Sequence, residues 1–466
     1  MNHRVPARAL AIAILATDLP AWAFEWNGFA DQRLEHAQTR ARSLVPTADF
    51  PEDQATTEIN FKFESKDAPH LTLKSDVSLL GRAAEHFRAT DADGYPLATK
   101  PSGLARRKLW ANVAEAYAAL SASEKWSFIL GKKRVVWGSG FAANPTDLLN
   151  PPKDPLEPSS ERAGAWLLGT ELITNAATVT ALLVPQVQED DRGIWERGLR
   201  FRAADTGAEE DRYLAALRLY TLIADTDINL MAFFSKKFDG FATKLRPALS
   251  ASKFVTQALE FHAEVLLTEG SARLLPTACT ESMTTMAACR RSGEPLVTPA
   301  KIHSHKVYPH ALLGTRYAFA NESELSLEYL YLADGFSAQE FAGFTNLVAA
   351  GGAPLSSLGS VSSNGQPVAG KLRRHYLTLG HQRYQFLDDI YLSTNGLINA
   401  DDGSGLIQAS LLWQATETIH LTLAGLKTLE WDPRRGVQTM ARSERVSESD
   451  LSPQEYRLTA AIRAYF

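Results

Sequence analysis

The sequence of 466 residues predicts an all-β protein, a single antiparallel transmembrane β-barrel of about 16 to 18 strands. Three observations predict this fold class: an amphipathic strand that ends the chain, an alternation of short and long links, and a secretory signal at the N-terminus. The mean hydropathy is slightly polar, and no run of 18 apolar residues exists, which excludes a protein built from membrane helices. A barrel has such a composition because only alternate residues of each strand face lipid.

The C-terminal segment 453–466 has the period of two that is typical of a strand. One parity is mostly polar, and the other consists of Tyr456, Leu458, Ala460, Ile462, Ala464 and Phe466. An exposed strand of this kind promotes aggregation, whereas a closed barrel removes the edge and places the apolar face in lipid. The alternative is an ordinary edge strand. The segment resembles the closing strand of Gram-negative outer-membrane barrels, which implies recognition of Phe466 by the barrel-assembly machinery.

The first residues have the features of a secretory signal peptide. A basic region comes first, an apolar stretch follows over 9–16, and Ala-Trp-Ala at 21–23 fits a small-x-small cleavage site. The alternative is a soluble N-terminal helix. The sequence therefore predicts a signal peptide over 1–23 and a mature barrel over 24–466.

Export would place the two cysteines in an oxidising compartment. Cys279 and Cys289 lie in a stretch with little strand character, 277–299, and a disulfide between them is the expected state. Two free thiols are the alternative. A metal site is disfavoured because two cysteines alone do not complete four ligands, and no metal or other cofactor is expected.

The candidate strands alternate with short turns and long polar links. Because the last strand would end in the periplasm, the short turns are predicted to be periplasmic and the long links extracellular. The predicted strands are 26–40, 57–64, 69–81, 109–121, 125–136, 164–174, 177–187, 212–224, 227–236, 246–253, 257–268, 306–319, 323–333, 372–381, 384–395, 405–416, 418–430 and 454–466. The long links are 82–108, 137–163, 188–211, 269–305, 334–371 and 431–453.

Several of these strands carry charges on one face only. In 257–268, for example, Glu260, His262 and Glu264 alternate with apolar residues. A Lys or Arg on the lipid face costs about 2–4 kcal/mol at mid-bilayer, so the charged faces are predicted to point inward. Same-face neighbours lie about 7 Å apart along one strand, which is too far for a compact metal site. The predicted pore-lining residues are Glu115, Lys132, Arg134, Glu171, Glu260, His262, Glu264, Arg316 and Glu328.

One motif carries a more specific resemblance. Glu115-Ala-Tyr is followed by a short turn, by Gly-Lys-Lys-Arg-Val-Val-Trp-Gly at 131–138, and by Asn-Pro-Thr-Asp at 144–147. This pattern resembles a loosely defined group of porin-like outer-membrane proteins of Gram-negative bacteria, and it implies fold and location much more than substrate. Cross-strand pairing would place Glu115 beside Lys132 or Arg134. The predicted rim and loop residues are Trp137, Gly138, Asn144 and Asp147, with Trp137 in the aromatic girdle and glycines that bend the loop inward.

These observations predict passive, porin-like passage of small hydrophilic solutes through the outer membrane. The net charge of −5 with interspersed signs gives no nucleic-acid surface. An enzyme is not expected, because Ser363-Asn364-Gly365 follows Val361 where outer-membrane phospholipases have His. The alternatives are a loop-plugged barrel that serves an envelope assembly or export system, and a surface-binding protein that works through its long loops. Whether 137–163 and 334–371 fill the lumen separates pore from plug; solute, selectivity and oligomeric state stay open.

Overall fold

The structure is a computed structural model. It describes residues 23–40, 44, 53–66, 70–84, 106–150, 153–185, 213–236, 244–271, 275–298, 305–349, 372–430, 437–438, 445–452 and 454–466. The predicted signal peptide, except Ala23, and the second half of the link 334–371 lie outside these residues, as does Ser363-Asn364-Gly365.

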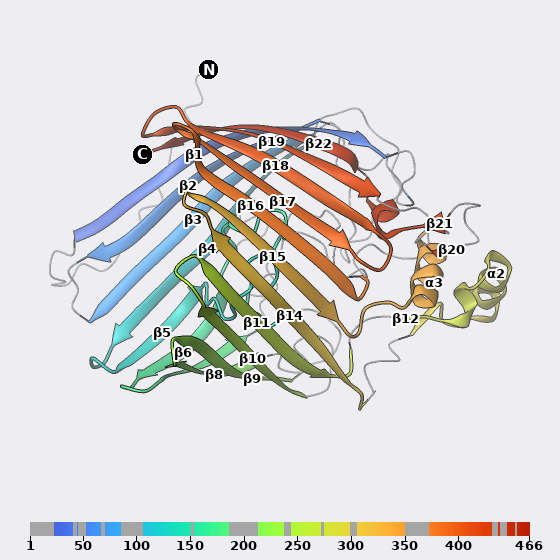
Figure 1. The fold of residues 1–466 in the computed structure, drawn as a ribbon, viewed down its shortest axis with the longest axis horizontal. Coiled ribbons are helices and arrows are strands. Elements are labelled where there is room, and N and C mark those ends of the chain that lie inside the picture. Colours follow the sequence, from blue (N-terminus) through green and yellow to red (C-terminus); the bar gives the residue numbers. More distant parts are fainter. Residues whose placement is uncertain are drawn as a thin grey trace, which may run out of the picture.

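Eighteen antiparallel strands form one closed sheet, in which each strand pairs with its neighbours in sequence and β1 pairs with β22 (Figure 1). The predicted fold class is confirmed, with the higher of the two strand numbers. The strands are β1 (Ala23–Thr39), β2 (Asp53–Lys66), β3 (Leu71–Ala84), β4 (Arg106–Ser121), β5 (Trp126–Lys133), β6 (Ala165–Ile173), β7 (Thr178–Pro185), β8 (Tyr213–Ile223), β9 (Thr226–Lys236), β10 (Lys244–Phe254), β11 (Leu259–Glu269), β14 (Val307–Ala318), β15 (Ser323–Leu332), β16 (His375–Leu387), β17 (Ile390–Asn399), β18 (Ser404–Gln414), β19 (Ile419–Glu430) and β22 (Gln454–Tyr465).

One predicted turn is wrong. The sequence placed the link between two strands at 382–383, whereas β16 continues to Leu387 and the turn lies at Asp388 and Asp389. Asp388 has a φ of 36°, in the left-handed region that Asp tolerates better than most residues. The pairing of β16 with β17 also shifts between Arg383 and Leu387, which extends β16 past the apparent break in its alternation.

The short turns lie at one end of the barrel, the turn end, and the long links lie at the other, the loop end. The small elements of the links gather at the loop end, at the right in Figure 1, while the C-terminus lies at the opposite end. These elements are β12 (Leu275–Pro276), η2 (Ala278–Thr280), α2 (Met283–Ser292), β13 (Val297–Thr298), α3 (Ala338–Ala349), β20 (Val437–Gln438), β21 (Arg445–Val446) and η5 (Glu448–Leu451). No helix in the described ranges is long and apolar enough to cross a membrane.

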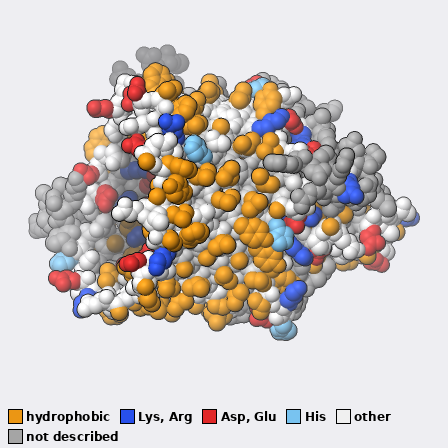
Figure 2. Space-filling model, viewed as in Figure 1, with side chains coloured by type: hydrophobic (Ala, Val, Ile, Leu, Met, Phe, Trp, Pro, Cys, Tyr) orange, Lys and Arg blue, Asp and Glu red, His pale blue; other side chains and the backbone are white. Residues whose placement is uncertain are grey.

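The outer surface of the barrel is apolar. Figure 2 shows hydrophobic side chains spread over the face formed by the strands, with charged side chains mostly toward its margins. The exposed residues include Leu217, Leu230, Phe261, Leu313 and Leu327, which alternate with inward residues along their strands. This inside-out arrangement is what a bilayer requires of a barrel wall.

The C-terminal residue completes the closing seam. The Gly28 N–H donates to the Phe466 carbonyl (3.0 Å), and the Phe466 N–H donates to the Gly28 carbonyl (3.1 Å). The Phe466 ring lies 6.1 Å from the ring of Trp26 and 6.0 Å from that of Phe61. A Cβ at position 28 would lie 2.2 Å from the Asn60 carbonyl oxygen and 2.9 Å from the Phe466 ring. Gly28 therefore provides the space in which the last residue docks.

Cys279 and Cys289 form the expected disulfide. It ties η2 to α2, and α3 packs against η2, where the Asn346 amide donates to the Thr280 carbonyl (2.9 Å). The bridge thus stiffens a small hairpin at the loop end, separate from the barrel wall.

Replacement of both cysteines by serine is expected to loosen this hairpin and leave the barrel intact. Loop-closure entropy gives about 3 kcal/mol for a ring of roughly ten residues, and this stabilisation would act locally. Limited proteolysis should then cut within 277–298 much faster than in the parent. The gel-shift temperature of the folded barrel should stay the same; a barrel that unfolds together with the hairpin would contradict this assignment.

Candidate functional site

The link between β5 and β6, residues 134–164, folds into the barrel and is called the inner loop here. Two backbone irregularities lie in the strands that lead into the inner loop. β4 carries a bulge where its pairing with β3 shifts between Asp76 and Val77, and Gly131 in β5 has a φ of 127°. Trp126, Phe128 and Leu130 face outward, whereas Lys132 of the same parity is only 2% exposed.

A buried glutamate of β11 holds the first part of the inner loop. Glu264 of β11, 1% exposed, accepts hydrogen bonds from the Ser139 N–H (2.5 Å) and the Gly140 N–H (2.6 Å) at one oxygen. Its other oxygen accepts from the Thr146 N–H (3.2 Å) and the Thr146 hydroxyl (2.7 Å). Gly138 has a φ of 100°, and a Cβ there would lie 2.6 Å from the Glu264 carboxylate. The carboxylate thus supplies acceptors for a loop segment that has no strand partner.

A second buried glutamate, Glu328 of β15, holds the next turn of the loop. It accepts from the Phe141 N–H, from the Ala142 N–H (2.8 Å) and from the Ala143 N–H (3.3 Å). His262 of β11 lies 2.9 Å from the same carboxylate through Nε2, and both side chains are almost fully buried. The pair therefore braces the wall beneath the loop.

Apolar contacts complete the docking. Trp137 and Leu149 of the loop pack into a buried cluster with the inward side chains of β6 to β11, and Trp137 lies 5.7 Å from the ring of Phe233. Ala143 and Leu156 belong to a second cluster with inward side chains of β14 to β17. The inner loop therefore covers the apolar part of the inner wall.

The inner loop also has its own polar framework. Asp147 accepts from Asn150 (2.9 Å) and forms an ion pair with Arg162 at 2.9 Å. Burial raises the pKa of the Asp147 carboxyl, and the charge of Arg162 opposes that effect. Lys153 donates to the carbonyls of Gly140 (2.6 Å) and Phe141 (2.9 Å), and burial lowers its pKa, although Glu264 and Glu328 act in the opposite direction.

The last part of the inner loop contacts the inner wall formed by β2 and β3, which lies outside the two apolar clusters. Glu161, whose side chain is 59% exposed, pairs with Lys62 of β2 at 3.1 Å, and Lys62 lies 3.5 Å from Asp76 of β3. On the same wall Arg463 of β22 pairs with Asp31 of β1 at 3.0 Å. Lys62, Lys74 and Arg463 keep about a third of their side-chain surface exposed. The water-accessible charges of the described lumen therefore include a group along β22, β1, β2 and β3.

The structure distributes the predicted pore-lining residues over four places. Glu260 pairs with Arg316 (2.7 Å) toward the turn end, and Glu171 accepts from Thr180 (3.3 Å). Residues near the start of the inner loop form a third group: Glu115 accepts from the Arg134 N–H (2.8 Å) and lies 3.8 Å from Lys74, while Arg134 donates to the Arg162 carbonyl (2.6 Å). The remaining residues, His262, Glu264, Glu328 and Lys132, are buried.

Three expectations need correction. Trp137 does not lie in an aromatic girdle at the rim, because it is 1% exposed and packed inside the barrel. Glu264 and Glu328 do not face an open lumen, because the inner loop covers them. Asn144 and Asp147 lie in the buried loop and not at the rim. Lys62, Arg463 and Glu161 were missed, although the alternation Glu58, Asn60, Lys62, Glu64 in β2 is a signal of an inward polar face.

A second inward element closes part of the loop end. The short helix η5 is buried, and Glu448 accepts from the Tyr376 hydroxyl (2.7 Å) and the Asn399 amide (2.6 Å). Asp450 lies 3.5 Å from the Arg40 guanidinium, which also pairs with Glu430 at 3.2 Å. This network fixes the link before β22 against β16, β17 and the end of β1.

Comparison with known proteins supports the fold and does not give a substrate. No family model matches the chain, and no curated protein matches it in sequence. Among solved structures, OccAB1 of Acinetobacter baumannii aligns with a TM-score of 0.51 and 8% identity over 95% of this chain and 96% of that one. OpdK of Pseudomonas aeruginosa, solved with vanillate, aligns with a TM-score of 0.50 and 8% identity over 95% and 98%.

The fold thus defines the class of protein: a porin-like β-barrel of 18 strands. At 8% identity the likeness concerns the fold alone, so the solute must be argued from this chain's own residues.

Proposed function

We propose that this protein is a passive channel of the outer membrane for small hydrophilic solutes. The pathway runs between the inner loop and the charged wall of β22, β1, β2 and β3. One observation carries the proposal: the inner loop packs on the apolar part of the wall and leaves water-accessible charges on the opposite part. A barrel of this width has space for an aqueous channel beside a packed loop.

The ion pair of Lys62 and Glu161 is the proposed constriction. It joins the wall to the last part of the inner loop, and Arg134 lies 3.9 Å from the same carboxylate. Charges of both signs that face a narrow aqueous gap act on every solute that passes, and they discriminate by charge and by size. The proposal assigns no catalysis and no cofactor to the lumen.

The proposed setting follows from the chain ends and the outer surface. A signal peptide over 1–23 would export the chain, the barrel-assembly machinery would recognise Phe466, and the apolar outer face would contact lipid. The short turns would then lie in the periplasm and the long links outside the cell.

Replacement of Lys62 by glutamine is expected to shift the channel toward cations. Coulomb's law in water gives about 0.5 kcal/mol for a unit charge about 8 Å from a passing ion, which corresponds to about a twofold change in relative permeability. The reversal potential in a planar bilayer under a salt gradient measures this change. Lys427→Gln is the matched control. Lys427 also forms an ion pair, with Glu455 at 2.6 Å, but it lies on the same outward face of β19 as Leu423 and therefore outside the proposed pathway. Equal shifts in both variants would contradict the proposed pathway.

The depth of loop packing favours a second candidate function, a plugged barrel that serves an envelope assembly or export system. The inner loop is anchored on both β11 and β15, and η5 occupies part of the loop end. Such a barrel would refold into its heat-modifiable form and still give no steady openings in the bilayer. Steady openings of the parent protein would exclude it.

A further inference from the structure

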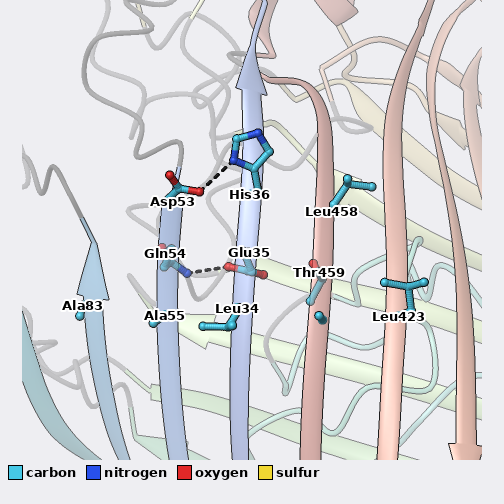
Figure 3. A pocket seen from close by; sticks show the side chains of 11 residues that line it. Leu34, Glu35, His36, Asp53, Gln54, Ala55, Ala83, Leu423, Leu458 and Thr459 are labelled. Carbon is cyan, nitrogen blue, oxygen red and sulfur yellow. Dashed lines mark hydrogen bonds and ion pairs between the residues drawn. The ribbon is translucent and has the colours of Figure 1, made fainter.

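One face of the barrel differs from the rest of its outer surface. This seam face consists of the outward residues of β3, β2, β1, β22 and β19, where the two ends of the chain meet. One row of paired residues across this face has three small and two large side chains: Ala83, Ala55, Leu34, Ala460 and Leu423. The small side chains leave a groove of about 510 Å³, which Figure 3 shows across these strands.

Two polar pairs flank this row on the surface that should face lipid. Toward the loop end, His36 Nδ1 lies 2.8 Å from the Asp53 carboxylate, and both side chains are more than half exposed (Figure 3). Toward the turn end, the Thr57 hydroxyl donates to the Gln32 side-chain oxygen (2.6 Å), and this bond is also exposed. Gln32 lies near the middle of β1 and not at a strand end. The bond with Thr57 uses the side-chain oxygen of Gln32, and its side-chain NH2 group can donate hydrogen bonds as well.

Contact of these polar pairs with the hydrocarbon of the bilayer is unfavourable. Amide and carboxylate groups against lipid tails lose the hydrogen bonds that water or protein would provide. The outward residues on the far side of the barrel, such as Leu217, Leu230 and Phe261, match lipid without this cost. Another protein surface could approach closely over the small side chains and satisfy the polar groups.

We propose that the seam face binds a second copy of this chain. Two copies inserted in the same orientation lie at the same depth in the membrane. A polar pair on one copy therefore meets the residues at the same depth on its neighbour, which include the same polar pair. Gln32 and Thr57 both donate and accept, and the pair of His36 and Asp53 presents both signs of charge, so each pair complements its own kind. The inference rests on the membrane placement proposed above and goes beyond channel function.

The first test compares tryptophan at two outward alanines. Ala55→Trp fills the groove, whereas Ala263→Trp places the same ring on the outward face of β11, away from the seam. In mild detergent the parent and Ala263→Trp should have a mass of two or more barrels, and Ala55→Trp the mass of one. A single-barrel mass for the parent overturns the proposal, even where a co-purified lipid occupies the groove.

The second test traps the contact in the membrane. Gln32→Cys should give a disulfide-linked dimer under mild oxidation, because Cys279 and Cys289 are already bonded to each other, and Ala263→Cys should give none. Dimers from both variants, or from neither, overturn the proposal. If Ala55→Trp fails to fold, the double variant Gln32→Leu with Thr57→Val replaces it, with the same expected loss of the oligomer. Single barrels that have lost the oligomer are still expected to conduct in single-channel recordings. Loss of the oligomer and loss of conductance are therefore separate results, and the first can fail without the second.

Discussion

Replacement of Glu264 by glutamine is expected to release the inner loop from the wall and to produce wide, fluctuating openings. The carboxylate accepts four hydrogen bonds from the loop, and glutamine turns one of its oxygens into a donor that faces other donors. Each buried donor left without an acceptor costs about 1–3 kcal/mol. The population of released loop should therefore rise at least about tenfold.

Single-channel recording measures this release as larger current levels and more current noise. Glu260→Gln is the matched control, because Glu260 lies on the same face of β11 and pairs with Arg316 instead of with the loop. Thr146→Val removes one hydroxyl donor to Glu264 and should have a smaller effect in the same direction. Identical current histograms for Glu264→Gln and Glu260→Gln, both in folded barrels, would show that Glu264 does not hold the loop.

Replacement of Gly28 by alanine is expected to impair barrel closure. A Cβ at this position would lie 2.2 Å from the Asn60 carbonyl oxygen, so a strand must move, and the Phe466 ring must move as well. The two hydrogen bonds between Gly28 and Phe466 close the end of the seam, and their distortion weakens the pairing of β1 with β22.

The folded yield after refolding into lipid vesicles, read from heat-modifiable migration, measures closure. Gly81→Ala is the matched control, since a Cβ there would meet only a Leu109 methyl at 3.8 Å on the same outer surface. We expect a large loss of folded yield for Gly28→Ala and none for Gly81→Ala. Equal yields would mean that the seam tolerates an extra methyl group and that Gly28 is not a constraint on closure.

The sequence determined the barrel and the order of its strands. Alternation in segments such as 257–268 and 323–333 is a local property, and the cost of a charge against lipid fixes which face points outward. The disulfide between Cys279 and Cys289 also followed from a short separation and from the predicted export. The turn predicted at 382–383 was wrong for a local reason, because a bulge between Arg383 and Leu387 interrupts the alternation on which the prediction relied.

Only the tertiary structure decided what the inward charges do. Glu264 and Glu260 share one face of one strand, and no local pattern distinguishes the one that holds a loop from the one that pairs with an arginine. The difference arises because the inner loop returns across the lumen from β5, more than a hundred residues earlier in the chain. The same packing buries Trp137 and leaves about a third of the Lys62 side chain exposed, because the loop covers the apolar wall and meets the charged wall through Glu161. Alternation gives the direction of a side chain, and long-range packing decides whether that side chain meets water or protein.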